Sequence, residues 1–400
     1  MSNPWPLAPL GEVLTERQEV PSPDALARGE IRILAKIGFD DGLIQLRTGS
    51  ETKTGMILIR PGDLVVSGIN AAKGAIAIYD GANSEPIAAT IHYGAYVPRK
   101  EKVDAWYLWW LLRSGTFRDL LLKYVPGGIK TELKASRLLR VPVPLPPIPQ
   151  QRRIVARIEE LAANIHYART LRQHALNESD ALLKTARRVL ISDFPGATLE
   201  LQEVCAEIID NLHSNPRYAE TGIPCIRSPD VGYGTLNLDG ALCTDEDEYR
   251  RRTMRGEPQP DDIVLVREGG GTGKCALVLP GQRFSLGQRV MMLRPDREKV
   301  LPKFLLHQLL SPLIQEDQMA PLSKGSASPH LNIGALKQFS FRFPSITNQQ
   351  RMVAKLDALQ AKVDALKKLQ AATAAELDAM LPSILDKALK GELRRGPEKE

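Results

Sequence analysis

Residues 146–161 read P-P-I-P-Q-Q-R-R-I-V-A-R-I-E-E-L, and residues 344–359 read P-S-I-T-N-Q-Q-R-M-V-A-K-L-D-A-L. Identical residues recur at a constant offset of 198, as in the pair Gln151 and Gln349 and the pair Arg153 and Arg351. The offset is close to half of the 400-residue chain, so the sequence indicates two copies of one plan. A repeat of this length is a domain with its own helix, because solenoid repeats run to about 20–50 residues.

Each copy of this stretch opens a long amphipathic helix. Residues 151–191 contain no Pro or Gly, and their apolar residues recur at alternating steps of four and three, out to Leu182 and Val189. The second copy repeats this pattern through Met380 to Ile384. Such a narrow stripe predicts a seam that packs against an element of similar length, and the other helix is the obvious candidate. The residues that we assign to the seam and to partner docking are Ile154, Ile158, Leu161, Ile165, Met352, Leu356, Leu359 and Val363.

The ends of both helices carry recognisable signals. Pro149 suits a first helical turn, and Thr347 with Gln350 fits a capping box. About 40 helical residues span roughly 60 Å. Pro382 lacks a backbone donor and is expected to kink or end the second helix.

The segments that precede the helices share a mixed pattern. Residues 10–13 and 201–204 begin the two copies alike, and each copy then carries a turn that runs into an apolar strand, a second short strand and a helix. These elements fall at 61–66, 75–79 and 103–113 in copy one, and at 260–265, 275–279 and 300–310 in copy two. We therefore predict an α+β protein, with two mixed α/β domains separated by two long helices. The expected domains are residues 1–145, 146–195 (helical), 196–343 and 344–400 (helical with a tail).

Composition limits the class of protein. The chain is 43% apolar and 25% charged, with a net charge of +6, a mild basic excess that suggests a polyanionic partner. The N-terminus shows no secretion signal, and the longest apolar run, at 105–112, is too short for a bilayer. We expect a cytoplasmic protein without a membrane partner. The cysteines form no C-x-x-C pair, so we expect reduced thiols and no metal site at Cys205, Cys225, Cys243 and Cys275.

Two short motifs bear on catalysis. Residues 268–275 read E-G-G-G-T-G-K-C, which departs from a phosphate-binding P-loop at both ends, in Glu268 and Cys275. Residues 215–218 read N-P-R-Y, where adenine methyltransferases carry N-P-P-Y, and no Gly-rich cofactor loop stands at the expected distance upstream. We therefore predict a non-catalytic chain with no catalytic residues.

Basic and amide side chains near the turns are the candidates for contact with DNA. An Asn can pair with adenine and an Arg with guanine through two hydrogen bonds, whereas the run at 250–252 could grip phosphates. The aromatic cluster at 106–110 is expected to pack in the core. The predicted DNA-contacting residues are Arg47, Lys53, Asn70, Lys73, Arg251, Arg267, Lys274 and Arg289.

With the repeat laid out, the chain resembles the specificity subunit of a type I restriction–modification system over nearly its whole length. The doubled helix starts carry most of the resemblance, together with P-G-D-L-V-V-S-G-I-N-A-A-K-G-A at 61–75. The L-G-E-V at 10–13 and the turns at Gly127-Gly128 and Lys324-Gly325 agree with it.

The resemblance implies a subunit that reads a split double-stranded DNA site, one half with each target-recognition domain. The two long helices between these domains would pair as an antiparallel coiled coil. That pair would act as a spacer and dock two methyltransferase subunits, and restriction subunits would join that core. S-adenosylmethionine and ATP would be bound by those partners and not by this chain. Two alternatives stay open: the recognition subunit of a methylation-only defence system, and a coiled-coil scaffold with two protein-binding modules.

Overall fold

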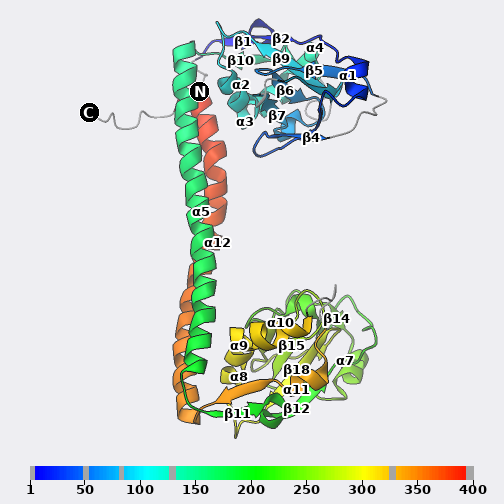
Figure 1. Ribbon diagram of the computed structural model, residues 1–400, viewed down its shortest axis with the longest axis vertical. Helices are drawn as coiled ribbons and strands as arrows, with labels where there is room; N and C mark the ends of the chain where they lie inside the picture. Colours follow the sequence, from blue (N-terminus) through cyan, green and yellow to red (C-terminus); the bar gives the residue numbers. More distant parts are fainter. Residues whose placement is uncertain (1–4, 48–53, 81–84, 126–131, 324–329, 393–400) are drawn as a thin grey trace, which may run out of the picture. The chain divides into compact units, whose positions relative to one another are not determined.

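The computed structural model describes residues 5–47, 54–80, 85–125, 132–323 and 330–392. The chain forms two compact units: unit 1 is Met1–Leu171 with Ala371–Glu400, and unit 2 is Arg172–Gln370. Both long helices, α5 (Ile148–Ser192) and α12 (Ile346–Leu389), contribute to both units. In each unit a body of strands and short helices lies beside its own stretch of the two helices (Figure 1).

The two units contain the same four-stranded antiparallel sheet. In unit 1 the strand order is β2-β9-β6-β7, with β2 (Leu14–Glu16), β9 (Tyr93–Pro98), β6 (Leu64–Ser67) and β7 (Ile76–Ile78). In unit 2 it is β12-β18-β15-β16, with β12 (Cys205–Asp210), β18 (Val290–Pro295), β15 (Ile263–Val266) and β16 (Cys275–Leu277). The predicted strands are confirmed as β6 and β7 in unit 1 and as β15 and β16 in unit 2, and β6 and β15 each follow the turn that was expected before them.

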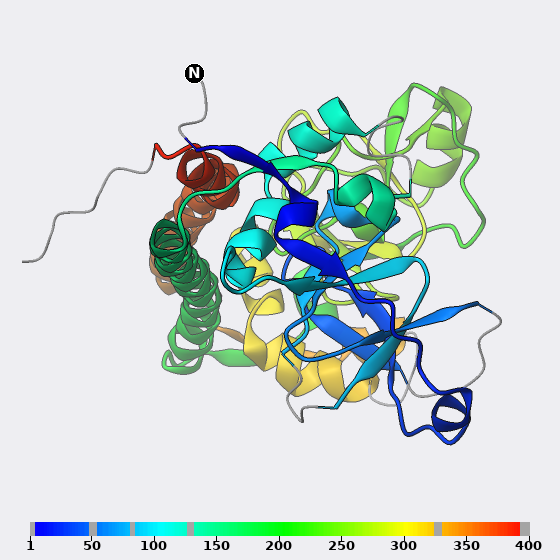
Figure 2. The ribbon, with the colours of Figure 1, turned by 90° about the horizontal axis from the view of Figure 1, so that it is seen from above.

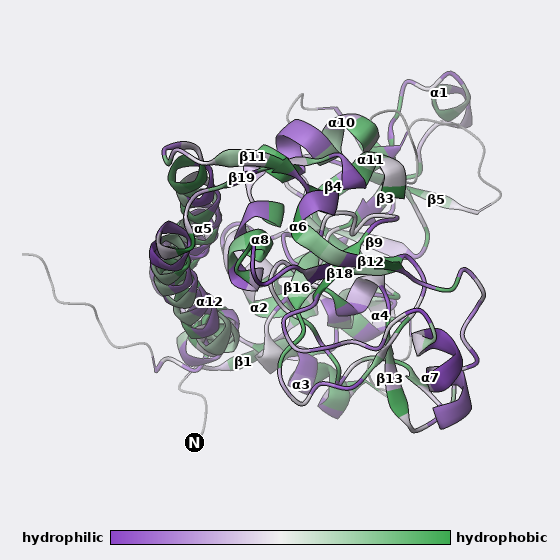
Figure 3. Ribbon diagram, turned by 90° about the horizontal axis from the view of Figure 1, so that it is seen from below, coloured by the Kyte–Doolittle hydropathy of each residue, from purple (hydrophilic) through white to green (hydrophobic). Residues whose placement is uncertain are grey.

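The second sheet of each unit differs. Unit 1 has the order β4-β3-β8-β5, formed by β4 (Ile44–Arg47), β3 (Ile33–Ile37), β8 (Ile87–Thr90) and β5 (Met56–Ile59). Unit 2 has three short strands in the order β14-β13-β17, formed by β14 (Cys243–Thr244), β13 (Ile223–Ile226) and β17 (Ser285–Leu286). Next to them lie α1 (Pro23–Ala27) in unit 1 and the strongly hydrophilic α7 (Glu246–Thr253) in unit 2 (Figure 3).

Short helices lie between the common sheet and the long helices. The predicted helices at 103–113 and 300–310 are confirmed as α2 (Ala105–Leu112) and α8 (Pro302–Leu309). Tyr107 is fully buried and Trp109 and Trp110 pack against the core, but Trp106 is 46% exposed, so the packing prediction was wrong for that residue. The other short helices of the two units are α3 (Gly115–Tyr124), α4 (Ala135–Leu138), α6 (Leu201–Val204), α9 (Pro312–Ile314), a π-helical turn (Gln315–Met319), α10 (Ala320–Ser323) and α11 (Ile333–Lys337).

A two-stranded ribbon precedes each long helix. In unit 1 it pairs β1 (Leu7–Pro9) with β10 (Pro142–Pro144), and the chain leaves β10 directly into α5 (Figure 2). In unit 2 it pairs β11 (Ala197–Glu200) with β19 (Ser340–Phe343), which leads into α12. The helices begin at Ile148 and Ile346, two equivalent positions of the repeat.

The buried stripe of α5 departs from the predicted ladder in its second half. Leu182 and Val189 are 55% and 46% exposed, whereas Leu183, Arg187 and Ile191 are buried. An α-helix with 3.6 residues per turn drifts by about 20° per heptad from a strict 3.5-residue repeat, so the inner face moves on by one position. Met380 of α12, which was also expected in the seam, is 48% exposed.

Pro382 does not end α12, which continues for seven further residues to Leu389. Leu385, Ala388 and Leu389 of this last stretch are buried in the core of unit 1. Their burial offsets the loss of one backbone hydrogen bond at the proline. Within the described ranges, no helix combines the length and the apolar character that crossing a membrane requires.

Candidate nucleic-acid interface

The turn between β6 and β7 presents Ile69, Asn70 and Lys73 in unit 1. Ile69 and Lys73 are exposed, Asn70 is half-exposed, and the Asn70 backbone amide donates to Ser67 Oγ at 3.2 Å. The turn closes at Gly74, whose φ of +91° and close approach to the Phe39 carbonyl leave no room for a side chain. The backbone therefore fixes the direction in which Asn70 and Lys73 point.

A second layer of side chains supports this turn. Trp109 Nε1 donates to the Ile76 carbonyl at 3.0 Å, and the Arg113 guanidinium lies 4.2 Å from the Trp109 ring. Arg113 also donates to the Phe39 carbonyl at 2.9 Å, and the Phe39 ring lies 5.8 Å from Lys73 Nζ. Trp109 and Arg113 of α2 thus support the turn and help to position it.

In unit 2 three of the predicted basic residues frame the equivalent turn. The Arg267 amide donates to the Arg289 carbonyl at 2.9 Å, and the Val266 amide donates to the Lys274 carbonyl at 2.8 Å. Arg289 is exposed and Lys274 is half-exposed. Arg267 is only 5% exposed and pairs with Glu268 at 2.8 Å and Asp210 at 3.4 Å, so its charge is already matched within the protein.

The glycine-rich loop at this turn is a structural turn. The amides of Thr272, Gly273 and Lys274 all donate to carbonyls of the loop or of β15, so they do not form a cradle for phosphate. Gly273 has a φ of +89°, and a Cβ there would lie 2.4 Å from Gln315 Oε1. The glycine is needed for the close packing of the loop on Gln315, which agrees with the interpretation against a P-loop.

The arginine run of α7 surrounds one buried carboxylate. Glu248 is fully buried and pairs with Arg251 at 2.6 Å, Arg252 at 2.9 Å and Arg217 at 3.1 Å. These hydrogen bonds, led by the one from Arg251, lower the pKa of Glu248 to about 2. Glu248 therefore balances much of the positive charge of the run within unit 2. Arg250 is exposed and lies 3.7 Å from Glu246.

The other predicted contact residues lie apart from these turns. Arg47 is exposed at the end of β4, on the second sheet of unit 1. Lys53 lies outside the described residues, as do the turns at Gly127-Gly128 and Lys324-Gly325. In the part of the chain that the structure describes, no cluster of His, Cys, Asp and Glu could hold a metal ion, and the four cysteines are free.

A buried glutamine links each long helix to its globular body. Gln151 Oε1 accepts from the Asp104 amide at 2.8 Å, and its Nε2 donates to the Pro146 carbonyl at 2.7 Å. Gln349 makes the same two bonds, each at 3.0 Å, with the Leu301 amide and the Pro344 carbonyl. Asp104 and Leu301 are the capping residues of α2 and α8. The repeat pointed to these glutamines, but sequence reasoning did not assign them this role.

The residues predicted for the seam are buried or half-buried within the units. Ile158 and Leu356 are fully buried, and Leu161 and Leu359 are half-buried. Ile154 packs in the core of unit 1 and Met352 in that of unit 2, while Ile165 and Val363 are buried farther along the helices. The opposite face is exposed, and it repeats as well: the matching exposed residues are Arg153 and Arg351, Ala156 and Ala354, and Ala163 and Ala361.

Comparison with known proteins gives consistent results. Residues 255–373 match the family model described as type I restriction modification DNA specificity domain. The chain is 24% identical over 285 residues to the EcoBI specificity subunit of Escherichia coli, covering 63% of this chain and 58% of that protein. It is 20% identical over 361 residues to the EcoKI specificity subunit of Escherichia coli K12, covering 84% of this chain and 75% of that protein.

Two solved structures share the fold. One is a chain of a type I R-M system, with a TM-score of 0.76 and 24% identity over 98% of this chain and 100% of that chain. The other is the HsdS subunit of Thermoanaerobacter tengcongensis, with a TM-score of 0.61 and 24% identity over 98% of each chain. The chain thus contains a type I restriction–modification DNA specificity domain and has the fold of type I specificity subunits, which it resembles in sequence along most of its length.

Proposed function

We propose that this chain is the sequence-specific DNA-binding subunit of a type I restriction–modification complex and that it reads a bipartite site. The observation that carries the proposal is that one antiparallel sheet, with one glutamine at the start of the attached helix, occurs in both units. Two copies of one reader suit the two half-sites of a split target. The second sheets differ between the units, which would let the readers recognise different bases.

We infer that the two helices pair as an antiparallel coiled coil. One ion pair supports this inference because it occurs twice: Asp180 with Lys367 at 2.7 Å in unit 2, and Asp378 with Arg169 at 2.8 Å in unit 1. The residues of the second pair are those of the first displaced by the offset of the repeat. In the first pair the aspartate is on α5 and the lysine on α12, and in the second pair the aspartate is on α12 and the arginine on α5. Two antiparallel copies of one helix produce such an exchange. Such a pair would act as the spacer between the readers.

The exposed repeated face of the helices is our candidate for methyltransferase docking. Packing gives a reason for identical residues at buried positions, but not at exposed ones such as Arg153 and Arg351. Neither arginine makes a hydrogen bond or an ion pair within the described parts of the chain. A surface that is presented twice suits two copies of one partner, here two methyltransferase subunits, and restriction subunits would join this core. S-adenosylmethionine and ATP would be bound by these partners.

Copurification tests the docking face. Arg153→Glu combined with Arg351→Glu should abolish recovery of the methyltransferase with this chain, while the exposed positions leave the fold intact. Lys368→Glu is the matched control, since Lys368 is equally exposed on α12 but is replaced by Thr170 in the other copy. Undiminished recovery with the double variant would rule out this face as the docking surface.

DNA contact is proposed for the side chains that the turns leave free. These are Asn70 and Lys73 in unit 1 and Lys274 and Arg289 in unit 2, together with Arg47 at the end of β4. Lys53, which lies outside the described residues, stays a candidate from the sequence alone. We expect Arg251 and Arg267 to contribute less, because Glu248 and Glu268 already share their charges.

Duplex binding by the assembled methyltransferase complex tests the DNA function. Affinity should fall steeply with salt, and Lys274→Ala or Arg289→Ala should lower the salt slope by about one unit where the residue contacts phosphate. Arg297→Ala, at an exposed arginine outside the proposed contacts, serves as the control. Binding that is weak and independent of salt would favour the scaffold with two protein-binding modules.

A further inference from the structure

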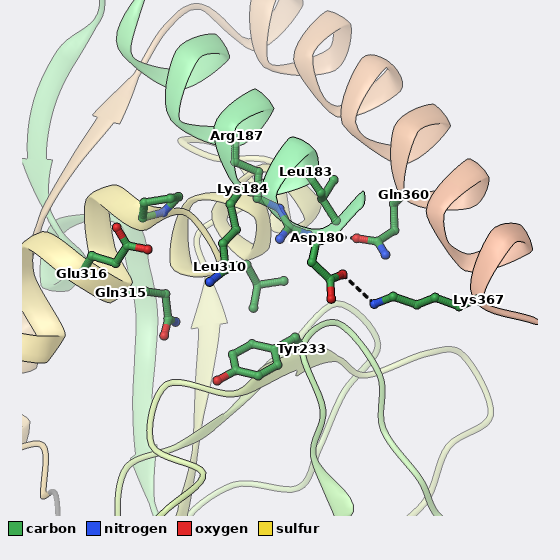
Figure 4. A pocket seen from close by; sticks show the side chains of 11 residues that line it. Asp180, Leu183, Lys184, Arg187, Tyr233, Leu310, Gln315, Glu316, Gln360 and Lys367 are labelled. Carbon is green, nitrogen blue, oxygen red and sulfur yellow. Dashed lines mark hydrogen bonds and ion pairs between the residues drawn. The ribbon is translucent and has the colours of Figure 1, made fainter. Parts of the chain in front are cut away.

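A cavity of about 340 Å³ lies within unit 2, between the long helices and the globular body. Figure 4 shows its side chains: Asp180, Lys184 and Arg187 of α5, Gln360 and Lys367 of α12, and Tyr233, Leu310 and Gln315 of the body. The volume falls in the range of small-molecule sites. The lining combines an apolar wall with several charged groups, so the balance of those charges decides what the cavity could hold.

Arg187 is a buried charged group of this cavity that forms no ion pair among the described residues. Its side chain is 5% exposed, its Nη2 donates to Gln360 Oε1 at 2.9 Å, and its Nε is buried with no hydrogen-bond partner among the described residues. No carboxylate of those residues forms an ion pair with it. Burial of this guanidinium is costly and lowers the pKa of Arg187. The carboxylate of Asp364, which accepts a hydrogen bond from Gln360 at 2.8 Å, opposes this shift but forms no ion pair with the guanidinium. An anion in the cavity would offset this cost.

The remaining charges leave a net attraction for an anion. Asp180 is neutralised by Lys367 at 2.7 Å, and Glu316 lies 3.6 Å from Arg188. Lys184 lines the cavity and makes no ion pair in the part of the chain that the structure describes. Arg187 and Lys184 are therefore two cations, one turn apart on α5, that form no ion pair with a carboxylate of the described residues.

The internal repeat supplies a comparison for Arg187. The equivalent position in copy two is Leu385, which is buried in the core of unit 1 with Phe117 and Leu121. A leucine is therefore sufficient for a long helix to pack against its globular body. Unit 2 has an arginine that lines a cavity where unit 1 has a leucine in its core, so packing alone does not account for Arg187.

We propose that this cavity binds a small organic anion, whose carboxylate or phosphate group pairs with Arg187 and Lys184. Its apolar part would lie against Leu183, Leu310 and the ring of Tyr233, which is 59% exposed. The bound anion would link both helices to the body of unit 2. The proposed DNA contacts are not among the residues that line the cavity, but Gln315, which does line it, packs on the loop before Lys274. Ligand binding is therefore measured without DNA.

Anion binding by the purified full chain tests the proposal. Calorimetry and thermal unfolding would use inorganic phosphate, adenosine monophosphate and benzoate, with adenosine and benzamide as neutral counterparts at constant ionic strength. We expect saturable binding of at least one anion, at least tenfold tighter than its neutral counterpart. Tighter binding of adenosine monophosphate than of benzoate would indicate a phosphate ligand, and tighter binding of benzoate would indicate a carboxylate ligand.

Two variants make the result specific to the cavity. Arg187→Leu copies the residue of the other unit, so it should fold, and it should weaken anion binding at least tenfold. Arg169→Leu removes the same charge from an exposed pair in unit 1 and should leave binding unchanged. The proposal is overturned if none of the anions binds, or if Arg187→Leu binds them as tightly as the wild type.

Discussion

At the scale of single residues, the glutamine repeated at the start of each helix connects the helix to the body. Gln349→Leu keeps the approximate volume but leaves the Leu301 amide and the Pro344 carbonyl without their partner. Two buried polar groups without partners cost about 2–4 kcal/mol, so we expect a loss of that size in the free energy of unfolding. Gln350→Leu, at the exposed neighbour, should change it by less than about 0.5 kcal/mol. Urea unfolding of both variants measures the difference, and equal losses would contradict the assigned role.

Glu248 gives a prediction with a defined pH dependence. Its pKa is lowered from 4.5 to about 2 in the folded protein, so its ionised form stabilises the fold above pH 4.5 and this contribution is lost as the pH falls toward 2. At pH 7, Glu248→Gln should lower the free energy of unfolding by on the order of 3 kcal/mol. The difference in the free energy of unfolding between wild type and variant should shrink as the pH is lowered from 5 to 3. A difference in unfolding free energy that stays constant with pH would show that the stabilisation does not come from the charge of Glu248.

At the scale of elements, the length of the two long helices should set the distance between the two half-sites of the recognised motif. Seven residues inserted after Ala168 and seven after Asp378 would lengthen both helices by about 10 Å and keep the ion pair between Arg169 and Asp378. At 3.4 Å per base pair, we expect the gap of the recognised motif to widen by about three base pairs while the half-sites stay the same. Methylation mapping of the lengthened subunit in its complex measures the gap. An unchanged gap in an active variant would exclude the helices as the spacer.

The elements also show how far the sequence predicts the fold. The strands at 64–67 and 263–266 and both long helices follow from hydrophobic pattern and repeat, because burial on one face leaves a period in the sequence. The burial of Leu183 in place of Leu182 did not follow, since it depends on a drift that accumulates along the helix. The second sheets were not predicted either, because β14 and β17 contain only two residues each.

The candidate site was less accessible to sequence reasoning than the fold. Arg267, Lys274 and Arg289 were selected because of their turns, and the structure brings them together around one loop. The burial of Arg267, in contrast to the exposed Arg289, could not be predicted from the sequence. It depends on Asp210, which is more than 50 residues away in the chain. The carboxylate at the centre of the arginine run, Glu248, was missed for a related reason: the sequence shows three adjacent charges but not the side to which each one turns.

At the scale of the whole molecule, the repeat predicts a two-part target. Each unit contains the same sheet, the same glutamine link and the same ion pair between the helices, and the units differ in their second sheets. Common parts would support and space the readers, and the differing parts would select the bases. The central claim is therefore that one chain specifies two unlike half-sites at a fixed distance.

A map of adenine methylation across the genome tests this claim most directly. The host would lack such marks and would express the neighbouring methyltransferase either with this chain or alone. We predict one split motif, methylated on both strands, that appears only when this chain is present. If a complex that is shown to assemble leaves no split motif, or if the methyltransferase alone produces the same one, the account is contradicted.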